Sequence, residues 1–205
     1  MRRDKIHDFY FHKAKKEKFS ARSIYKLENI QQKYHLISAG NRVLDLGAAP
    51  GSWTEYLVSL LGKKGALWAL DERELSLTAR DKIRKSEIKF TFLKQSVFEA
   101  LPSEIPSLDA VLSDMAPSTQ GNRTVDGTQS LELGQRAFEI AKKHLKQGGH
   151  FVVKLFHSED AVGATRTWGA HFRVYKLYRP PAVQKESKEI YFIGQNFKLD
   201  LAESS

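Results

Sequence analysis

The sequence predicts an α/β fold: a mostly parallel seven-stranded sheet with one antiparallel strand near the C-terminus and helices on both faces. Three observations predict it. Short apolar runs alternate with amphipathic stretches of helix length, polar or glycine residues follow several of these runs, and the last two runs are joined by a short loop. Alternating strands and helices are typical of a parallel sheet, whereas strands joined by a short loop are antiparallel.

The first expected element is a helix from Ser20, its cap, to about Tyr34, with Ile24, Leu27 and Ile30 as its apolar stripe. A buried strand at 42–46 leads into a glycine loop and a helix at 52–61. The pattern then repeats as a strand at 66–70, a helix at 74–85, and strands at 88–93 and 109–113.

The C-terminal part begins with a helix from about Thr128 to Leu145. Gly148 and Gly149 should stop this helix, because a helix ends readily where the chain needs a left-handed residue. A strand at 150–156, a helix at 158–168 and strands at 172–178 and 189–193 complete the sheet. The loop 179–188 is too short for a helical crossover, so the last strand should be the reversed one.

Composition limits the possible functions. The 205 residues suit one α/β domain, without an internal repeat. There is no cysteine, which excludes disulfides and thiolate metal sites, and the histidines show no ligand-like spacing, so no metal is expected. No apolar run is long enough for a bilayer and the N-terminus lacks a secretory core, so we expect a cytoplasmic protein without a membrane partner, and a monomer.

The net charge of +9 suits a polyanionic partner, although charge alone is also compatible with a role in solubility. Basic residues concentrate near the N-terminus, where aromatic residues that could stack on unpaired bases are interleaved with them. We therefore expect a basic N-terminal arm and helix at 1–36 as part of an RNA-binding surface, a catalytic domain at 37–198 and a tail at 199–205. The expected phosphate contacts are Lys13, Lys15, Lys16, Lys18 and Arg22.

The loop from Asp45 to Trp53 is the first candidate binding site. Glycines after a first strand let the backbone approach a ligand closely, and the following helix offers free amides. A dinucleotide would require Gly-x-Gly-x-x-Gly, but here Gly47 and Gly51 are spaced Gly-x-x-x-Gly and Pro50 removes one amide donor. The loop therefore favours a cofactor without phosphates, and a purely structural turn is the alternative.

Two aspartates at strand ends and one lysine within a strand complete the candidate site. Asp71 closes the second strand, where a carboxylate can accept hydrogen bonds from both ribose hydroxyls of an adenosine, although a helix-capping role is also compatible. Asp114 follows the fourth strand. Lys154 interrupts the apolar strand 151–156, and a lysine there is costly unless it is paired, used or able to reach solvent at the strand end.

At this point the sequence resembles the FtsJ/RrmJ family of ribosomal-RNA ribose 2′-O-methyltransferases over nearly its whole length. The matching segments are Ala21 to Leu27, Asp45 to Trp53, Asp114 to Pro117, Gly148 to Phe156 and Ser187 to Tyr191. Each motif is modest, but all of them in this order are specific. The resemblance implies a Rossmann-like class I methyltransferase fold, S-adenosyl-L-methionine as cofactor, and rRNA or the large ribosomal subunit as partner.

The resemblance also implies residue roles. The family's Lys-Asp-Lys-Glu tetrad falls on Lys26, Asp114, Lys154 and Glu189. We expect Lys154 to act as base or hydroxyl-orienting group, with Asp114 steering it, Lys26 positioning the ribose or its phosphate and Glu189 supporting the lysines. Together with the candidate loop, the resemblance places cofactor contacts at Gly47, Pro50, Gly51, Trp53, Asp71, Val97 and Asp114. Val97 departs from the family, which commonly has an acid there, so only its backbone could contact adenine, and Glu99 is a weaker substitute.

Other functions stay open. The preferred function is 2′-O-methylation of a uridine in large-subunit, 23S-type rRNA. An mRNA-cap or tRNA ribose 2′-O-methyltransferase and a non-catalytic ribosome-assembly RNA-binding protein are the alternatives. An NAD-dependent oxidoreductase is disfavoured by the absent Gly-x-Gly-x-x-Gly, and a Ser-His-Asp hydrolase by the absent nucleophile elbow.

Overall fold

The computed structural model describes residues 23–118 and 122–199. Its sheet has seven strands in the order β3-β2-β1-β4-β5-β7-β6. All neighbouring strands are parallel except β7, which is antiparallel to both β5 and β6. The elements in chain order are α2 (Ile24–Tyr34), β1 (Arg42–Leu46), α3 (Ser52–Leu61), β2 (Ala66–Leu70), α4 (Leu77–Lys85), β3 (Lys89–Leu93), β4 (Leu108–Ser113), α5 (Arg123–His144), β5 (Leu145–Phe156), α6 (Glu159–Gly169), β6 (Phe172–Tyr178) and β7 (Glu189–Phe197).

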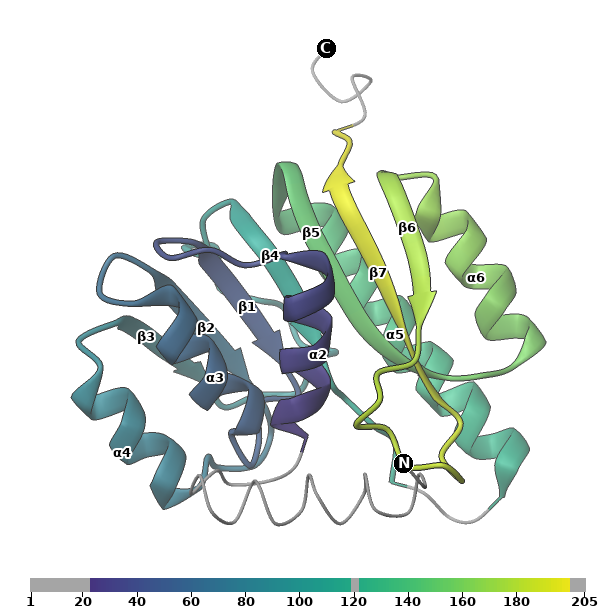
Figure 1. Ribbon diagram of the computed structural model, residues 1–205, viewed down its shortest axis with the longest axis horizontal. Coiled ribbons are helices and arrows are strands. Elements are labelled where there is room, and N and C mark those ends of the chain that lie inside the picture. The colour runs from purple at the N-terminus through teal and green to yellow at the C-terminus, as the bar shows by residue number, and fades with distance from the viewer. Residues whose placement is uncertain (1–22, 119–121, 200–205) are drawn as a thin grey trace.

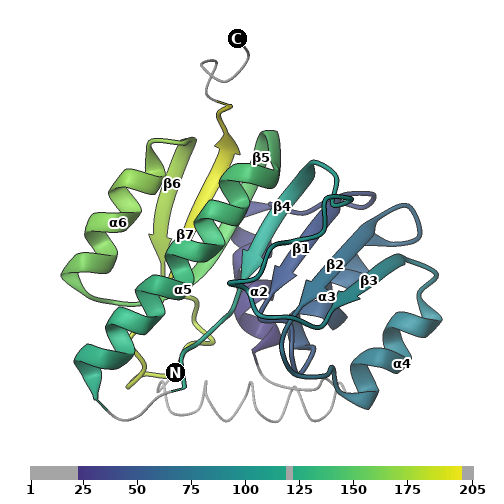
Figure 2. The same cartoon turned by 180° about the vertical axis from the view of Figure 1, so that it is seen from behind.

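Helices cover the sheet on both faces (Figures 1 and 2), which confirms the predicted fold class and the single reversed strand. Helices α2, α3 and α4 lie on one face, and α5 and α6 lie on the other. Strand side chains alternate between the two faces. On β1, Val43 therefore joins the core under α2 and α3, while Leu44 and Leu46 join the core under α5 and α6.

The core under α5 and α6 is rich in aromatic rings. Phe151 of β5 and Phe192 of β7 lie 5.9 Å apart between ring centroids, and Trp168 of α6 meets Phe192 edge-on at 5.8 Å. Such ring pairs contribute beyond the area they bury. They fix α6 against the antiparallel part of the sheet. In the described residues, no helix is long and apolar enough to cross a bilayer.

Helix α5 and strand β5 differ from the prediction. The helix begins at Arg123, capped by the Asn122 side chain, rather than near Thr128, and it ends at His144, one residue before the predicted end. Leu145 leaves the helix in extended conformation and pairs with Leu108, so Gly148 and Gly149 lie within β5. The register of β4 and β5 shifts at this point. The glycines serve that irregularity: Gly148 has φ +79°, and a Cβ on Gly149 would lie 3.2 Å from a β4 carbonyl.

Two other element ends were predicted wrongly. Helix α4 begins at Leu77 rather than Glu74, because Ser76 is extended and its side chain accepts a hydrogen bond from the Ala79 amide. Strand β7 continues to Phe197 rather than Ile193, because its second half pairs with β6 down to Phe172. Ser20, the predicted cap of the first helix, lies outside the described residues.

Candidate functional site

Parallel strands bring their carboxyl ends to one edge of the sheet, and a cavity of about 590 Å³ lies at this edge. The loops that follow β1, β2, β3 and β4 form its walls. We call it the first cavity. Of the predicted cofactor contacts, Gly47, Asp71, Val97 and Asp114 line it. Its volume lies in the range of small-molecule sites.

Gly47 allows the chain to bend close to the loop after β4. Its φ is +76°, and a Cβ there would lie 2.6 Å from Cγ of Met115. Only glycine fits this position without displacing the cavity wall. The other predicted contacts of the loop, Pro50, Gly51 and Trp53, do not line the first cavity. The Pro50 carbonyl accepts a hydrogen bond from the Ser76 amide, and a Cβ on Gly51 would meet Ala79 at 2.4 Å.

Asp71 is held at the cavity by the neighbouring chain. One carboxylate oxygen accepts a hydrogen bond from the Ala49 amide at 2.9 Å, and the other from the Arg73 amide at 2.9 Å. The exposed Arg73 guanidinium also contacts Asp71, at 3.3 Å. Each carboxylate oxygen has more than one lone pair, so these bonds orient the group and leave acceptor capacity toward the cavity. No motif in the sequence indicates Arg73.

Val97 is buried at the cavity, and its carbonyl accepts a hydrogen bond from Nε of Arg136 at 2.8 Å. Arg136 belongs to α5 and also binds the Glu99 carbonyl. The Glu99 side chain accepts a hydrogen bond from the Ser96 amide, which folds it back onto its own turn. The structure thus gives the position after β3 a buried apolar side chain fixed by α5. Nothing local in the sequence indicates Arg136, which lies 39 residues away.

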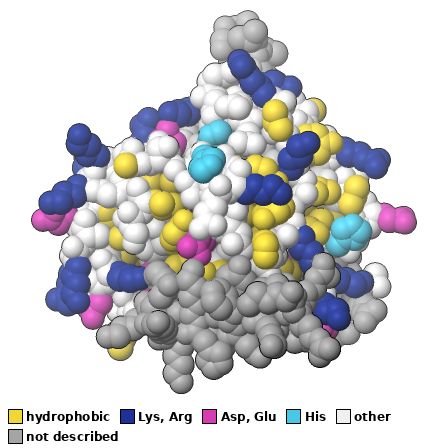
Figure 3. Space-filling view, viewed as in Figure 1, with side chains coloured by type: hydrophobic (Ala, Val, Ile, Leu, Met, Phe, Trp, Pro, Cys, Tyr) yellow, Lys and Arg dark blue, Asp and Glu magenta, His cyan; other side chains and the backbone are white. Residues whose placement is uncertain are grey.

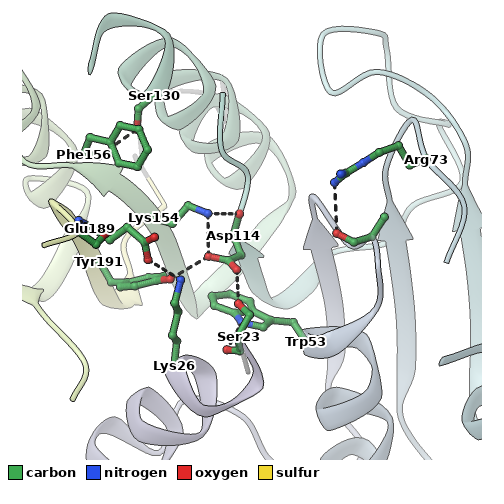
Figure 4. A network of polar contacts seen from close by, with 12 residues as sticks. Ser23, Lys26, Trp53, Arg73, Asp114, Ser130, Lys154, Phe156, Glu189 and Tyr191 are labelled. Atoms are coloured by element: carbon green, nitrogen blue, oxygen red, sulfur yellow. Dashed lines mark hydrogen bonds and ion pairs between the residues drawn. The ribbon is translucent and has the colours of Figure 1, made fainter. Parts of the chain in front are cut away.

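The predicted tetrad comes together at the same edge of the sheet (Figure 4). We call these four residues, Lys26, Asp114, Lys154 and Glu189, the tetrad. Nζ of Lys154 lies 3.0 Å from Oδ1 of Asp114 and also donates to the Asp114 carbonyl. Nζ of Lys26 forms an ion pair with Glu189. They come from α2, β5, β7 and the end of β4, so residues separated by up to 163 positions are brought together.

Ser23 and Tyr191 complete this network around Asp114. The Ser23 hydroxyl donates to Oδ2 of Asp114 at 2.6 Å, and the Tyr191 hydroxyl donates to Oδ1 at 2.8 Å. Trp53 stacks on Tyr191, with ring centroids 6.0 Å apart, and donates from its indole nitrogen to the Ser23 carbonyl. Trp53 therefore supports the residues around Asp114. Tyr191 could have been found in the sequence, since it lies two residues from Glu189 and so on the same face of the strand.

The electrostatics of the cluster keep Asp114 charged. Burial raises the pKa of Asp114, but the charges of Lys154 and Lys26 and the hydrogen bonds from Ser23 and Tyr191 outweigh it and hold this pKa below its ordinary value. Burial, together with the charges of Asp114 and Glu189, raises the pKa of Tyr191 well above its usual range. Tyr191 therefore stays a phenol and donates, while Asp114 accepts.

Lys154 is 7% exposed, and the other side chains of the strand segment 151–156 are apolar. A lysine in such a place needs partners, and the structure supplies both the carboxylate and the carbonyl of Asp114. Because Asp114 also lines the first cavity, a molecule bound there would contact the residue that holds Nζ of Lys154. This arrangement suits a reaction in which a bound donor meets a polar acceptor.

Comparison with known proteins shows which family this sequence matches. A model of the FtsJ-like methyltransferases matches residues 19–197. The chain belongs to the FtsJ-like methyltransferase family. Two relatives named ribosomal RNA large subunit methyltransferase E are each 39% identical. The match to the protein from Syntrophobacter fumaroxidans covers 94% of this chain and 97% of that protein. The match to the protein from Bdellovibrio bacteriovorus covers 93% of this chain and 97% of that protein.

The fold of this FtsJ-like methyltransferase also occurs in a solved structure from Plasmodium falciparum, described as a ribosomal RNA methyltransferase. The two chains superpose with a TM-score of 0.72 at 21% identity, over 87% of this chain and 98% of the other. The predicted RNA contacts Lys13, Lys15, Lys16, Lys18 and Arg22 lie outside the described residues.

Proposed function

We propose that this FtsJ-like methyltransferase transfers the methyl group of S-adenosyl-L-methionine to the ribose 2′-hydroxyl of a uridine in large-subunit rRNA. The observation that carries the proposal is the tetrad of Lys26, Asp114, Lys154 and Glu189 at the edge of the first cavity. The 39% identical relatives named ribosomal RNA large subunit methyltransferase E support the choice of acceptor.

The first cavity fits the proposed cofactor. Gly47 removes a side chain where the backbone must pass close to a ligand, and the oriented Asp71 carboxylate can accept hydrogen bonds from ribose hydroxyls. Val97 is buried where it lines the cavity, so its side chain, and not only its backbone as expected from the sequence, can offer an apolar surface to an adenine ring. Asp114 is the tetrad carboxylate that lines the cavity, where a positive sulfonium would be stabilised.

When bound, S-adenosylmethionine supplies an electrophilic methyl group on a sulfonium. The protein must then align the acceptor oxygen and help its proton to leave. We assign that role to Lys154, as base or hydroxyl-orienting group, because its Nζ is fixed by both the carboxylate and the carbonyl of Asp114. Lys26 positions the ribose or its phosphate, and Glu189 holds Lys26 by the ion pair between them.

The charge of +9 suits an RNA substrate. Lysine and arginine side chains spread over the face that carries α2, α3 and α4 (Figure 3). Lys33 of α2 lies on this face, with its Nζ 4.2 Å from the centre of the Tyr178 ring. We propose that residues 1–36 form part of the RNA-binding surface beside the catalytic domain at 37–198.

The proposal is tested by mapping ribose methylation across the rRNA of cells with and without this gene. We expect one methylated uridine of the large subunit to disappear when the gene is deleted and to return with a plasmid copy. A copy that carries Lys154→Ala should not restore it. Identical maps with and without the gene would overturn the proposed acceptor.

A further inference from the structure

A second cavity, of about 630 Å³, lies at the same edge of the sheet on the far side of the tetrad. Its walls are the first turns of α5, the end of β5 with the segment leading to α6, and the segment that precedes β7. Glu189 lines this cavity, while Asp114 lines the first one. In Figure 4, Phe156, Ser130 and Glu189 lie on one side of Asp114, and Arg73 lies on the other. The tetrad therefore stands between two cavities.

This position matters for transfer between two bound molecules. In an in-line displacement the acceptor oxygen approaches the methyl carbon from the side opposite the leaving sulfur. With the donor in the first cavity, the acceptor has to arrive from the other side of Asp114 and Lys154. The second cavity is on that side, and it is large enough for a nucleoside.

The walls of the second cavity combine an aromatic surface with polar groups. Phe156 is the last residue of β5 and pairs in register with Glu189 on β7. The Phe156 amide donates a hydrogen bond to the Ser130 hydroxyl at 3.0 Å, which fixes this strand end against α5. The Phe156 ring and Leu131 give apolar surface, and Thr128 and Ser187 add hydroxyl groups. Proteins bind an unstacked base with this combination, by stacking on its face and hydrogen bonding to its edge.

Charge decides which part of a nucleotide can enter. Four carboxylates line the cavity, those of Asp126, Asp160, Glu186 and Glu189, against one lysine, Lys188, and one histidine, His157. A phosphate would be repelled by this excess of negative charge. The uracil base is neutral, and its ring N3–H can donate a hydrogen bond to a carboxylate.

We propose that the second cavity binds the base of the nucleotide whose ribose is methylated, turned out of its stack, with its phosphates left outside. The proposal rests on the proposed function and assigns the acceptor side of that site. Binding the base here would place its ribose at the tetrad, between the base and the first cavity.

Gly127 offers a way to fill the second cavity without disturbing the fold. It lines the cavity from α5, and a Cβ on it would meet nothing within 4 Å. Gly163 on α6 is a matched control, because its Cβ would also meet nothing within 4 Å and it lies away from the cavity. Replacing either helical glycine should leave the melting temperature unchanged or raise it.

The experiment measures methyl transfer to rRNA from cells that lack the gene, using wild type, Gly127→Ala, Gly127→Leu, Gly127→Phe and Gly163→Phe. We expect kcat/KM for RNA to fall with the size of the side chain at position 127, reaching a loss on the order of tenfold or more with Phe. The affinity for S-adenosylmethionine, measured by calorimetry, should not change. Gly163→Phe should behave as wild type.

The outcomes separate this proposal from the one on which it rests. If wild type methylates rRNA and Gly127→Phe does so equally well, the second cavity is not the base site, while the proposed function stands. An equal loss in Gly163→Phe, or a loss already complete in Gly127→Ala, would also contradict base binding there. If wild type transfers no methyl group to rRNA, the proposed function fails, and the base site with it.

Discussion

The two halves of the sheet build their parts of the site in different ways. In the parallel half, β3-β2-β1-β4, the first cavity is formed by the chain just after each strand, where glycine conformation and backbone amides shape the walls. In the other half, Lys154 and Tyr191 project from within β5 and β7, where they are register partners. Loops after parallel strands form a binding surface from backbone, whereas an antiparallel pair holds reactive side chains at fixed spacing.

Two aspartates at the ends of neighbouring strands sharpen this contrast. Asp45, the residue before the last of β1, has one side-chain hydrogen bond, from Thr54 at 2.7 Å, and its other oxygen has no hydrogen-bond partner in the described part of the chain. Burial, reinforced by Asp114 and Asp71, raises the pKa of Asp45 to about 7, despite the opposing bond from Thr54. Asp114, just after β4, has two lysines and two hydroxyl donors, and its pKa is lowered. Partners, rather than burial alone, decide the charge of each carboxyl group.

The largest expected effect comes from the tetrad. Lys154→Ala should lower kcat for methyl transfer on the order of 10²–10⁴-fold, the usual contribution of a positioned acid or base. The affinity for S-adenosylmethionine should be retained, because the first cavity is built by the other half of the sheet. Rates and calorimetry on the same preparations check this, with the exposed Lys176→Ala of β6 as control. Transfer near the wild-type rate in Lys154→Ala would rule out the assignment.

The next effect concerns stability and Asp45. A carboxyl group whose pKa is raised by folding binds a proton in the folded state that the unfolded chain has already released, so its contribution to stability falls as pH rises toward 7. Relative to Asp45→Asn, wild type should lose about 3 kcal/mol of unfolding free energy between pH 5 and pH 8. Urea denaturation of both proteins at the two pH values measures it. A constant difference between them would show that Asp45 is ionised throughout.

A smaller effect should appear in the first cavity. Asp71→Asn keeps one oxygen acceptor but loses the charge, so the Kd for S-adenosylmethionine should rise about tenfold. At saturating cofactor the transfer rate should stay near that of wild type, the reverse of the pattern for Lys154→Ala. Asp81→Asn, an exposed position on α4, is the matched control. If Asp71→Asn lowered the rate at saturation and left the affinity unchanged, the two halves would not divide binding from chemistry.

Local signals explain what the sequence could predict. The strand ends before Gly47, Asp71 and Asp114 were predictable because each apolar run is followed by a turn or a polar residue, and parallel topology then brings these ends to one edge. The reversed last strand was predictable from the short loop before it. The start of β5 was misjudged because Gly148 and Gly149 can end a helix or kink a strand, and only the pairing with β4 decides between them.

Long-range contacts explain what the sequence could not predict. Arg136 reaches the Val97 carbonyl from α5, and Ser23 reaches Asp114 across 91 positions. Neither contact has a periodicity or spacing that marks it. The second cavity is assembled from three segments whose relative placement depends on the whole sheet. The resemblance to a family predicted the tetrad, and the structure shows the residues that hold it in place.

The most direct measurement is the chemical position of the transferred methyl group. Purified protein is incubated with unmodified large-subunit rRNA and methyl-labelled S-adenosylmethionine, and the digested nucleosides are analysed by mass spectrometry. The account predicts label in 2′-O-methyluridine alone, and none when Lys154→Ala replaces wild type. Label on a base, or no label in the RNA at all, would contradict it.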